Sequence, residues 1–480
     1  MVAAGGPLPV AADRRDWTPD DRERADLDLL LNGGYPALSG FLGRADVDSV
    51  HASARLASGK QWPIAVTLEV PDALAQCGPL RLTDPEGSPL ATMDVTESWP
   101  GGPGRHFVAG PVSRLAATEY GAFSSLHLTP SEVRPALAGS PALAVIAGSA
   151  LHNDDLAATR AAAAALGARV LVLIPTADPG SERLVRAVLA GAAEIPGAQV
   201  VALPLPRPDG SMAQALRAAH VAAAYGATHL LSRATLPSPP LTVVAPPAPL
   251  DQLTPLDPLD APALTATELA DLLDSGAPLP AGFTPPAVER ELRRARRPRG
   301  ERGLVVLFTG LSGSGKSTLA RGLHDVLLER GDRTTTLLDG DVVRRMLSAG
   351  LGFSRADRDL NVTRIGYVAA EVARHGGVAI CAPIAPYETT RARVRAMAAA
   401  VGDFLLIWVA TPLEHCEQRD RKGLYAKARA GQLTGFTGID DPYEEPLDAD
   451  LVIDTSHRSV TDCLTEVVDL LKRGGWLGGP

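Results

Sequence analysis

The sequence is poor in cysteine and aromatic residues and has no long apolar segment. Its four cysteines lie far apart and none forms a Cys-x-x-Cys pair, so no zinc or redox motif is visible. Aromatic residues make up 4% of the chain and the formal net charge is −9, which argues against a nucleic-acid or anionic-membrane partner. The longest apolar stretch, 161–175, contains Gly167 and Arg169 and is too short to span a bilayer. The first residues lack a basic region followed by an apolar core, so we expect no secretory signal and a cytoplasmic protein with reduced thiols.

What the sequence does contain is typical of a multidomain globular protein. With 480 residues, 45% of them apolar and 21% charged, we expect roughly two to four domains rather than a disordered or fibrous chain. Of 46 basic residues only five are lysine, so a lysine can mark a place where a compact ammonium group is needed. The alternative, chance, is favoured at any single position. The five are Lys60, Lys316, Lys422, Lys427 and Lys472.

The composition changes along the chain. Residues 1–233 have a globular pattern, and the proline-dense stretch 234–264 predicts an extended connector. A short helix follows, with Thr267 as its expected N-cap. The basic run 291–303 predicts a solvated helix end plus linker, and a phosphate-binding patch is the less favoured alternative.

From residue 304 onward, short apolar runs of β type alternate with segments of helical spacing. The alternation predicts βαβ units and a parallel sheet that is covered by helices on both faces. The expected strands are 304–310, 334–341, 377–383, 403–411 and 449–456. The expected helices are 317–331, 361–377, 387–402, 412–423 and 459–475.

A glycine-rich segment between the first of these strands and its helix fits G-x-x-x-x-G-K-[ST]. Glycines let backbone N–H groups curl around an anion, and the helix N-terminus adds partial positive charge. Lys316 is expected to reach the β- and γ-phosphates of a nucleotide, and the Ser317 hydroxyl to ligate Mg²⁺. The expected ATP-binding residues of this loop are Gly310, Ser312, Gly313, Ser314, Gly315, Lys316, Ser317 and Thr318.

A series of later motifs resembles the adenylyl-sulfate (APS) kinase family over nearly all of 303–475. The motifs are Leu338-Asp-Gly-Asp-Val-Val-Arg344, Leu351-Gly-Phe-Ser354, Asn361-Val-Thr-Arg364, Ile384-Ala-Pro-Tyr387, Lys422-Gly-Leu-Tyr425 and Thr434-Gly-Phe-Thr-Gly-Ile-Asp-Asp-Pro-Tyr-Glu444. The resemblance implies that ATP phosphorylates the 3′-hydroxyl of adenosine 5′-phosphosulfate (APS). The products are then ADP and 3′-phosphoadenosine 5′-phosphosulfate (PAPS).

Two carboxylates at the end of the second strand of this region suit that reaction. A ribose hydroxyl is barely acidic, so a carboxylate must orient it and take its proton. We favour Asp341 as this base, and Asp339, together with Ser317, as the Mg²⁺ site. The alternative is that the two aspartates cap the helix that follows.

The resemblance also implies an acceptor site, because APS is an anion that carries an adenine. The implied APS-binding residues are Arg344, Phe353, Arg358, Asn361, Ile384, Lys422, Phe436, Gly438 and Asp440. Among them, the arginines and the asparagine hold the phosphosulfate, the two phenylalanines enclose the purine, and Lys422 and Asp440 belong to a mobile lid and the acceptor pocket. Arg419 is expected to reach the ATP phosphates as an internal arginine finger.

Three positions depart from the family's pattern. Val342 stands where the family usually has asparagine, and Thr363 stands where it often has an arginine that would contact the anion. Ala385 replaces a serine that can carry phosphate in some members, so transfer in this chain must be direct.

The N-terminal part resembles ATP sulfurylase (sulfate adenylyltransferase), whose first domain is PUA-like. The family's motif Gln-x-Arg-Asn-Pro-x-His-x-x-His corresponds to residues 146–155, where only His152 is kept and Asp155 replaces the second histidine. An acid beside a polyphosphate is unfavourable. A second motif, Gly-Arg-Asp-His-Ala-Gly, keeps only Arg233. We therefore expect a domain that has lost sulfate activation, with His152 as a loop or helix-cap residue.

The expected architecture is α/β. It comprises a β-rich PUA-like domain at 1–135, a reduced α/β nucleotidyltransferase-like domain at 136–233, a proline-rich linker with a remnant sulfurylase lobe at 234–302, and a P-loop kinase domain with a parallel sheet at 303–480. We expect an adenylyl-sulfate kinase of sulfate assimilation that uses ATP with Mg²⁺. By resemblance it is a homo-oligomer, and docking to a separate, active ATP sulfurylase is a further hypothesis.

Two alternatives stay open. The order of the fused parts is that of a bifunctional PAPS synthase, against which the lost Gln, Arg, Asn and His residues argue. A non-catalytic PAPS-sensing module is the other alternative, against which the intact phosphate loop argues.

Overall fold

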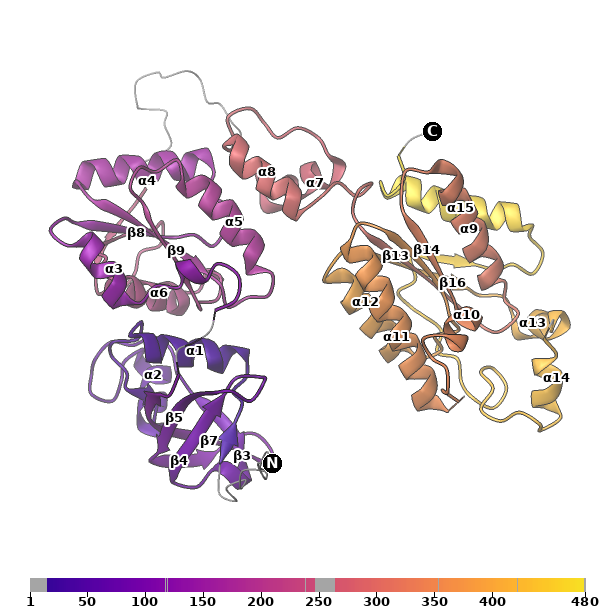
Figure 1. Ribbon diagram of the computed structural model, residues 1–480, viewed down its shortest axis with the longest axis horizontal. Helices are drawn as coiled ribbons and strands as arrows, with labels where there is room; N and C mark the ends of the chain where they lie inside the picture. Colours follow the sequence, from indigo (N-terminus) through magenta and orange to yellow (C-terminus); the bar gives the residue numbers. More distant parts are fainter. Residues whose placement is uncertain are drawn as a thin grey trace, which may run out of the picture. The chain divides into compact units, whose positions relative to one another are not determined.

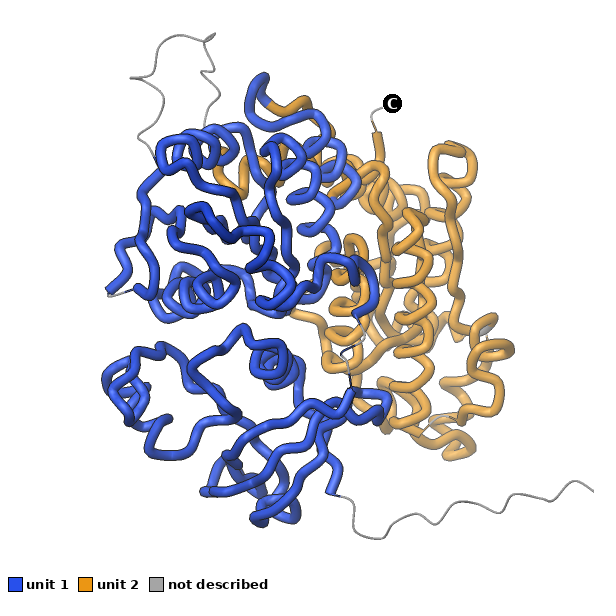
Figure 2. Tube along the Cα trace, turned by 60° about the vertical axis from the view of Figure 1, so that its left-hand side comes forward, with its two compact units in different colours: residues 1–263, 280–295 blue, residues 264–279, 296–480 orange. Residues whose placement is uncertain are grey.

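The computed structural model describes residues 15–478 except 117, 119, 238, 247–263, 353, 421 and the side chain of Asp341. Phe353, one of the two residues predicted to enclose the purine, therefore lies outside the described residues. The chain divides into two compact units, residues 1–263 with 280–295 and residues 264–279 with 296–480 (Figure 2). Within the described ranges, no helix is both long and apolar enough to cross a membrane.

The first unit begins with a mostly antiparallel sheet. Its strands are β1 (Asp16–Trp17), β2 (Gly40–Phe41), β3 (Leu68–Pro71), β4 (Gly78–Thr83), β5 (Pro89–Val95), β6 (Glu97–Pro100) and β7 (Arg105–Arg114). They follow the order β1-β4-β5-β7-β2, and β3 and β6 also pair with β7. The sheet packs with helices α1 (Asp21–Asn32) and α2 (Arg44–Ser53) around a core that includes the fully buried Trp62, Leu68 and Met93. The predicted β-rich N-terminal domain is confirmed.

A five-stranded parallel sheet follows in the same unit (Figure 1). Its strands are β8 (Ala142–Ile146), β9 (Arg169–Pro175), β10 (Gln199–Leu203), β11 (His229–Leu231) and β12 (Thr242–Val244), in the order β10-β9-β8-β11-β12. Helices α3 (Pro130–Leu137), α4 (Asn153–Leu166), α5 (Ser181–Ala192) and α6 (Met212–Ala224) accompany it. The prediction that 234–264 is only a connector is wrong at β12, because the β-branched Thr-Val-Val segment pairs with β11 at the sheet edge, where flanking prolines are tolerated.

Two short helices follow β12 in the sequence and precede the next parallel sheet. Helix α7 (Ala266–Ser275) is capped by Thr265, whose hydroxyl accepts from the backbone N of Glu268 at 3.2 Å, so the prediction of Thr267 as N-cap is wrong. Helix α8 (Pro286–Ala295) packs on α5, and its Val288 is fully buried. Helix α7 belongs to the second unit and α8 to the first.

The second unit is built on another parallel sheet, in the order β14-β15-β13-β16-β17. Its strands are β13 (Leu304–Thr309), β14 (Thr335–Asp339), β15 (Val378–Ala382), β16 (Asp403–Val409) and β17 (Leu451–Ile453). Its helices after α7 are α9 (Lys316–Arg330), α10 (Gly340–Arg345), α11 (Arg355–Arg374), α12 (Glu388–Ala399), α13 (Leu413–Arg419), α14 (Leu424–Arg429) and α15 (Val460–Arg473). Helix α11 begins earlier than predicted, because Ser354 caps it through the backbone N of Asp357.

Helices cover both faces of this sheet (Figure 1). Val306 and Phe308 of β13 pack with residues of α9 and α15, whereas Val305 and Leu307 pack with residues of α11 and α12. Successive side chains of a strand point to opposite faces, so a strand covered on both sides must be apolar throughout. The predicted parallel α/β architecture is confirmed.

The basic run 291–303 agrees only partly with the prediction of a solvated helix end followed by a linker. Helix α8 ends at Ala295 as expected, but three of the following arginines converge on one carboxylate, and Arg302 among them is mostly buried. Arg296 and Arg302 donate to Asp274 of α7, and Arg299 Nε lies 3.6 Å from Asp274 Oδ2. Asp274 is buried, so this cluster fixes α7 to the second unit.

Candidate active site

The glycine-rich segment forms a loop between β13 and α9. Gly310, Gly313 and Gly315 have φ values of +143°, +77° and +105°, which favour glycine. A Cβ atom at Gly310 would lie 2.4 Å from the carbonyl oxygen of Val409, and one at Gly313 would lie 2.9 Å from that of Cys416. Glycine is therefore required both by conformation and by space. The N–H groups of Gly310 and Ser314 bond to the carbonyl oxygens of Ile384 and Leu311, so an anion would be met by the other N–H groups of the loop.

Lys316 and its neighbours complete the phosphate loop. Lys316 is buried, and its Nζ donates to the carbonyl oxygen of Leu311 at 2.6 Å and lies 3.4 Å from Ser314 Oγ. The ammonium group is thus folded back over the loop. Ser317 is half-buried in the first turn of α9, and Thr318 beside it is exposed. A nucleotide polyphosphate would meet this end of the helix, where the helix dipole favours negative charge.

Residues from the C-terminal half of the unit hold the loop from outside. The hydroxyls of Thr411 and Thr455 both donate to the carbonyl oxygen of Ser314, at 3.0 and 2.8 Å. Arg419 donates to the hydroxyl and the carbonyl oxygen of Thr455, at 2.8 and 2.6 Å, and its Nη1 lies 3.4 Å from the carbonyl oxygen of Gly313. Arg419 therefore lies against the phosphate loop, and its role as an arginine finger stays a prediction.

The α14 segment supports the same loop. The hydroxyl of Tyr425 donates to the carbonyl oxygen of Ser312 at 2.8 Å. Because this contact uses a carbonyl of the loop, it does not occupy an N–H group that could bind an anion.

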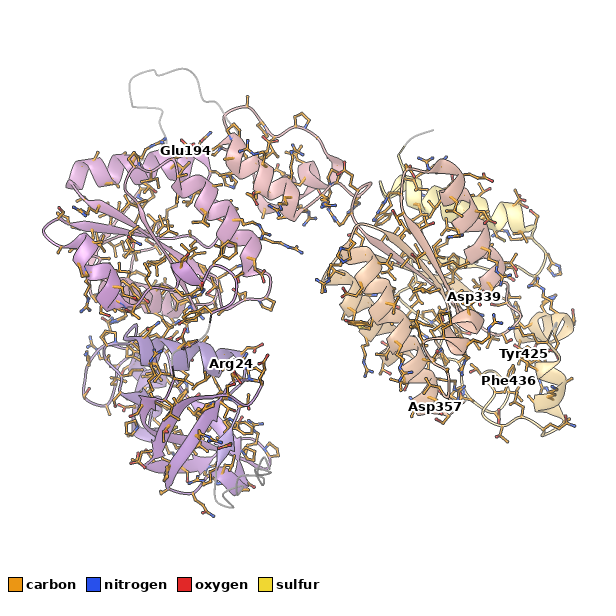
Figure 3. The ribbon with its side chains drawn as sticks, viewed as in Figure 1. Arg24, Glu194, Asp339, Asp357, Tyr425 and Phe436 are labelled. Carbon is orange, nitrogen blue, oxygen red and sulfur yellow. The ribbon has the colours of Figure 1, made fainter. Side chains whose placement is uncertain are left out.

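Asp339 ends β14 and is buried beside α9 (Figure 3). Its Oδ2 lies 3.1 Å from Nη2 of Arg321. Arg321 follows Ser317 by four residues on α9, so the two share one face of the helix, and the contact with Arg321 brings the Asp339 carboxylate to that face. A serine hydroxyl and a carboxylate are oxygen ligands of the kind that Mg²⁺ prefers. The residues present thus fit the implied metal.

Asp341 is the second residue of the short helix α10, which begins directly after Asp339. Because its side chain is not among the described parts, the choice of Asp341 as the base stays a prediction. Arg344, later in the same helix, donates through Nη1 to the carbonyl oxygen of Gly352 at 3.1 Å and so holds the loop that precedes α11.

Arg358 and Asn361 are buried one turn apart on α11. Arg358 Nη1 lies 2.8 Å from Thr437 Oγ1 and 2.9 Å from Asp441 Oδ2, and the hydroxyl of Tyr387 donates to the same carboxylate. Within the described residues, Arg358 Nε and Asn361 Oδ1 are buried without a hydrogen-bond partner. Buried polar atoms are nearly always satisfied, so these two are candidates to be satisfied by a ligand.

The loop after β15 joins these residues to the phosphate loop. The carbonyl oxygen of Ile384 accepts from Thr309 Oγ1 at 2.7 Å and from the backbone N of Gly310 at 3.3 Å. Ala385 has a φ of +46°, an uncommon conformation for a residue with a side chain, and its carbonyl oxygen accepts from the buried Arg391 at 2.9 Å. The predicted acceptor residue Ile384 therefore touches the start of the predicted ATP site.

The predicted lid residues lie in and beside a small apolar cluster after α13. The Phe436 ring is buried with its centroid 4.9 Å from that of Tyr425, edge to face (Figure 3). The Asp440 carboxylate accepts from the backbone N atoms of Gly435 and Phe436, which lowers its pKa. Gly438, at φ +92°, donates its N–H to the carbonyl oxygen of Asp441, and Lys422 is exposed. Phe436 as half of a purine clamp stays a prediction.

Sequence reasoning did not assign roles to Arg321, Tyr387 or Asp441. The position of Arg321 beside the expected metal ligand Ser317 could have been predicted from helical spacing, since Arg321 stands four residues after Ser317. Tyr387 and Asp441 stand inside quoted motifs, but nothing in the sequence shows that the Asp441 carboxylate, rather than that of Asp440, meets Arg358.

The turn between β8 and α4, which corresponds to the sulfurylase motif, is covered by residues of the first unit. His152 is the N-cap residue of α4, and its backbone N donates to Asp155 Oδ2 at 3.1 Å, as expected for a helix-cap residue. Its ring lies 4.3 Å from that of Phe283, and burial lowers its pKa. A Cβ at Gly148 would lie 2.6 Å from Pro208 Cδ, so the turn itself is tightly covered.

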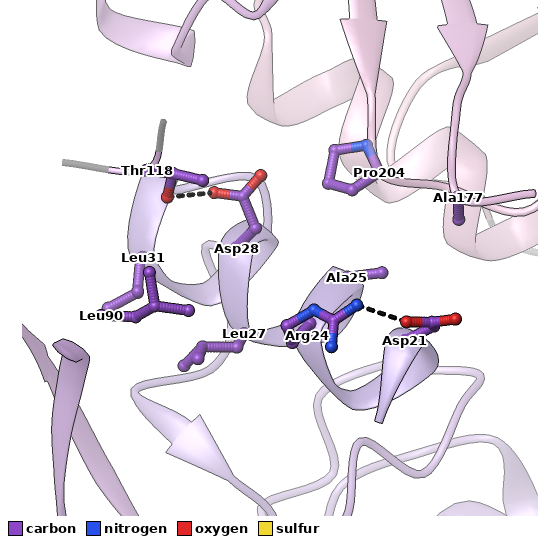
Figure 4. A pocket seen from close by; sticks show the side chains of 10 residues that line it. All are labelled: Asp21, Arg24, Ala25, Leu27, Asp28, Leu31, Leu90, Thr118, Ala177 and Pro204. Atoms are coloured by element: carbon purple, nitrogen blue, oxygen red, sulfur yellow. Dashed lines mark hydrogen bonds and ion pairs between the residues drawn. The ribbon is translucent and has the colours of Figure 1, made fainter. Parts of the chain in front are cut away.

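A cavity of about 260 Å³ lies elsewhere in this unit, lined by residues of α1 and by Ala177 and Pro204 (Figure 4). Its charged groups are already paired with protein: Arg24 forms an ion pair with Asp21, and Thr118 donates to Asp28. None of the predicted site residues lines it.

The second unit thus has the parallel sheet, the glycine-rich loop and the lysine of a P-loop kinase. Its residues 302–454 match the adenylylsulphate kinase family, and residues 11–105 match the PUA-like domain. The sulfate adenylyltransferase of Phaeosphaeria nodorum is 33% identical over 95% of this chain and 93% of its own length, and that of Mycosarcoma maydis is 32% identical over 97% and 96%. The chain belongs to the sulfate adenylyltransferase family and carries an adenylyl-sulfate kinase domain at its C-terminal end.

A solved structure agrees over nearly the whole chain. It is that of a hexameric APS kinase from Thiobacillus denitrificans, with a TM-score of 0.81, 33% identity, and coverage of 98% of this chain and 95% of the other. The predicted resemblance to APS kinase behind a sulfurylase-like region is confirmed.

Proposed function

We propose that this chain transfers the γ-phosphate of ATP to the 3′-hydroxyl of APS in the cytoplasm, giving ADP and PAPS for sulfate assimilation. The observation that carries the proposal is the contact between the two half-sites. Thr309 and Gly310, which open the phosphate loop, bond to Ile384 of the acceptor loop. A nucleotide on the loop and an acceptor near Arg358 would therefore be neighbours, as in-line transfer requires.

Different residues of the chain bind the nucleotide, hold the acceptor and accept the proton. The loop N–H groups and Lys316 bind the β- and γ-phosphates, and Arg419 adds positive charge from the side of Thr455. Arg358 and Asn361 hold the phosphosulfate of APS and satisfy their buried atoms by doing so. Asp341 orients the 3′-hydroxyl and accepts its proton as the new O–P bond forms and the bond to the β-phosphate oxygen of ADP breaks. Ser317 and Asp339 would hold Mg²⁺, which supplies charge neutralisation on the β- and γ-phosphate oxygens.

We further propose that the first unit has lost sulfate activation. The residues at 146–155 lack the amide, the arginine and the second imidazole of the family's motif, and Asp155 is engaged with the N-terminus of α4. His152 packs on Phe283 and Gly148 on Pro208, which leaves little room for a polyphosphate at this turn. The full-length sulfate adenylyltransferase relatives favour the second candidate, a bifunctional PAPS synthase.

One purified sample in two assays tests both parts. Mg-ATP with APS is followed for ADP and PAPS, and Mg-ATP with sulfate is followed for pyrophosphate. We expect turnover only in the first assay. Pyrophosphate release in the second would establish the bifunctional candidate, and bound nucleotide without turnover in either would point to a sensing module.

We also propose that the chain is a homo-oligomer, as the APS kinase of Thiobacillus denitrificans is hexameric. Light scattering coupled to size exclusion tests this, and a monomer at assay concentration would contradict it. A complex with a separate, active ATP sulfurylase is tested by pull-down with that enzyme.

A further inference from the structure

Arg321 is a cation in the phosphate-transfer region that the proposed reaction does not use. Its Nη2 lies 3.1 Å from Oδ2 of Asp339. The two partners differ in freedom, because the Arg321 side chain is 63% exposed whereas that of Asp339 is only 5% exposed. The carboxylate is therefore fixed by its surroundings, and the guanidinium can swing into solvent at little cost.

The position of Arg321 on α9 places it at the expected metal site. Ser317, in the first turn, and Arg321, one turn later, lie on the same face of the helix. Asp339, at the end of β14, contacts Arg321 on this helix. An oxygen ligand set built from Ser317 and Asp339 would thus form directly beside the guanidinium of Arg321.

Two cations cannot share this buried carboxylate without repulsion. A Mg²⁺ ion binds carboxylate oxygens at about 2.0–2.1 Å, so it would lie a few ångströms from a guanidinium held on the same group. Like charges at such a separation repel one another even near a protein surface, where the effective dielectric constant is about 20. The mobile partner, Arg321, is the one that can leave.

We propose that Arg321 is the counter-ion that holds Asp339 before the metal nucleotide binds, and that it leaves the carboxylate when the divalent cation arrives. Arg321 is then a positioning residue that sets how tightly the site takes its metal. It keeps the buried carboxylate compensated in the empty protein and competes with the cation that replaces it. This inference rests on the part of the proposed function that assigns Asp339 and Ser317 to Mg²⁺.

The test uses Arg321→Met in the full chain and measures Mn²⁺ binding to the ADP complex by electron paramagnetic resonance. Removing the competing cation is expected to tighten Mn²⁺ binding about tenfold. The same variant leaves Asp339 without this counter-ion, so without metal its unfolding temperature is expected to fall by about 3 °C. Saturating Mg²⁺ and ADP are expected to remove that difference.

Arg374→Met is the matched control. Arg374 is 54% exposed and forms an ion pair with Glu371, three residues earlier on the same helix, α11, which does not carry Ser317 or Arg321. It is expected to leave Mn²⁺ affinity unchanged. Unchanged or weaker Mn²⁺ binding in Arg321→Met would overturn the inference, as would a wild-type ADP complex that binds no Mn²⁺. A wild-type complex that binds Mn²⁺ but makes no PAPS would instead overturn the proposed reaction alone.

Discussion

The hydroxyl of Thr455 donates a hydrogen bond of 2.8 Å to the carbonyl oxygen of Ser314, a residue 141 positions earlier in the chain. Thr411 donates to the same oxygen, and the two threonine hydroxyls are 2.8 Å apart. Together they turn a carbonyl of the phosphate loop outward. A loop whose carbonyls are held away from its centre presents its N–H groups to an anion, so we expect these threonines to support nucleotide binding through the shape of the loop.

Thr455→Val is expected to weaken ADP binding about fivefold, because a neutral hydrogen bond contributes about 1 kcal/mol. Isothermal calorimetry with ADP measures this. Thr465→Val is the control, since the Thr465 hydroxyl bonds only to a carbonyl of its own helix in the described structure. Equal losses in both variants would show that the loop contact is irrelevant to affinity.

Lys316→Ala is expected to lower the rate of PAPS formation by a factor of about 10²–10³, as for loss of one group that stabilises transition-state charge. A coupled assay for ADP checks the rate. Lys472, exposed in the last turn of α15, provides the control variant Lys472→Ala, which should keep full activity. A Lys316→Ala protein that retains wild-type turnover would argue for a different phosphate-binding group.

Substitutions of Asp341 and Asp339 should impair different properties, the rate of phosphoryl transfer in one case and metal binding in the other. Asp341→Asn is expected to slow phosphoryl transfer by about 10²–10⁴ while Mn²⁺ still binds to the ADP complex, because only the proton acceptor is lost. Asp339→Asn is expected to weaken Mn²⁺ binding itself. If the two variants show the opposite pattern, the base and the metal ligand must be exchanged.

Asn361→Ala is expected to raise KM for APS about tenfold and to leave KM for ATP unchanged. The buried Oδ1 of Asn361 has no partner in the described residues, so a bound acceptor would supply its hydrogen bond. Steady-state kinetics with each substrate varied in turn distinguish the two constants. An equal rise in both would mean that the substitution disturbs α11 as a whole.

The cluster around Asp274 predicts a dependence of stability on pH. Burial alone would raise the pKa of Asp274, but hydrogen bonds from Arg296 and Arg302 outweigh burial and lower that pKa to about 2. Because the folded-state pKa lies below the ordinary value, the stabilisation is present above about pH 4 and is lost as the pH falls toward 2. Asp274→Asn is expected to cost roughly 2 kcal/mol of unfolding free energy at neutral pH and to flatten its acid dependence.

Urea denaturation of this variant between neutral pH and pH 3 measures that effect. Asp332→Asn, which removes the more exposed pair with Arg330, is the control and should change stability by well under 1 kcal/mol. A similar loss in both variants would contradict a special role for the buried cluster.

The sequence predicts the kinase sheet well because its central strands, β15, β13 and β16, are covered on both faces. A strand such as β13 must then be apolar throughout, and its apolar run stands out between helical segments. Strand β12 is not predicted in this way, because it is short, lies at a sheet edge and is flanked by prolines. Its pairing with β11 depends on tertiary contacts that no local pattern reveals.

The candidate site likewise has a part that the sequence predicts and a part that it does not. The glycines and Lys316 are predictable, since conformation and anion binding restrict the residue types at those positions. The partners of Arg358 and Asp339 are not predictable from the sequence, because the packing of the helices and strands determines which neighbour a long side chain contacts. The three arginines on Asp274 illustrate this: a charge run is usually solvated, and only the fold shows one buried carboxylate facing it.

The assignment of α7 to one unit and α8 to the other means that the units are interleaved along the chain. The backbone passes between them three times, near residues 263, 279 and 295. A single proteolytic cut, or a gene split at one point, therefore cannot release both units intact. A kinase fragment that began at residue 303 would lack Asp274 and the arginines bound to it, and a fragment that began at residue 264 would carry α8 without the helix α5 on which it packs. The kinase unit thus includes residues 264–279, which precede the kinase motifs in the chain, as part of its own fold.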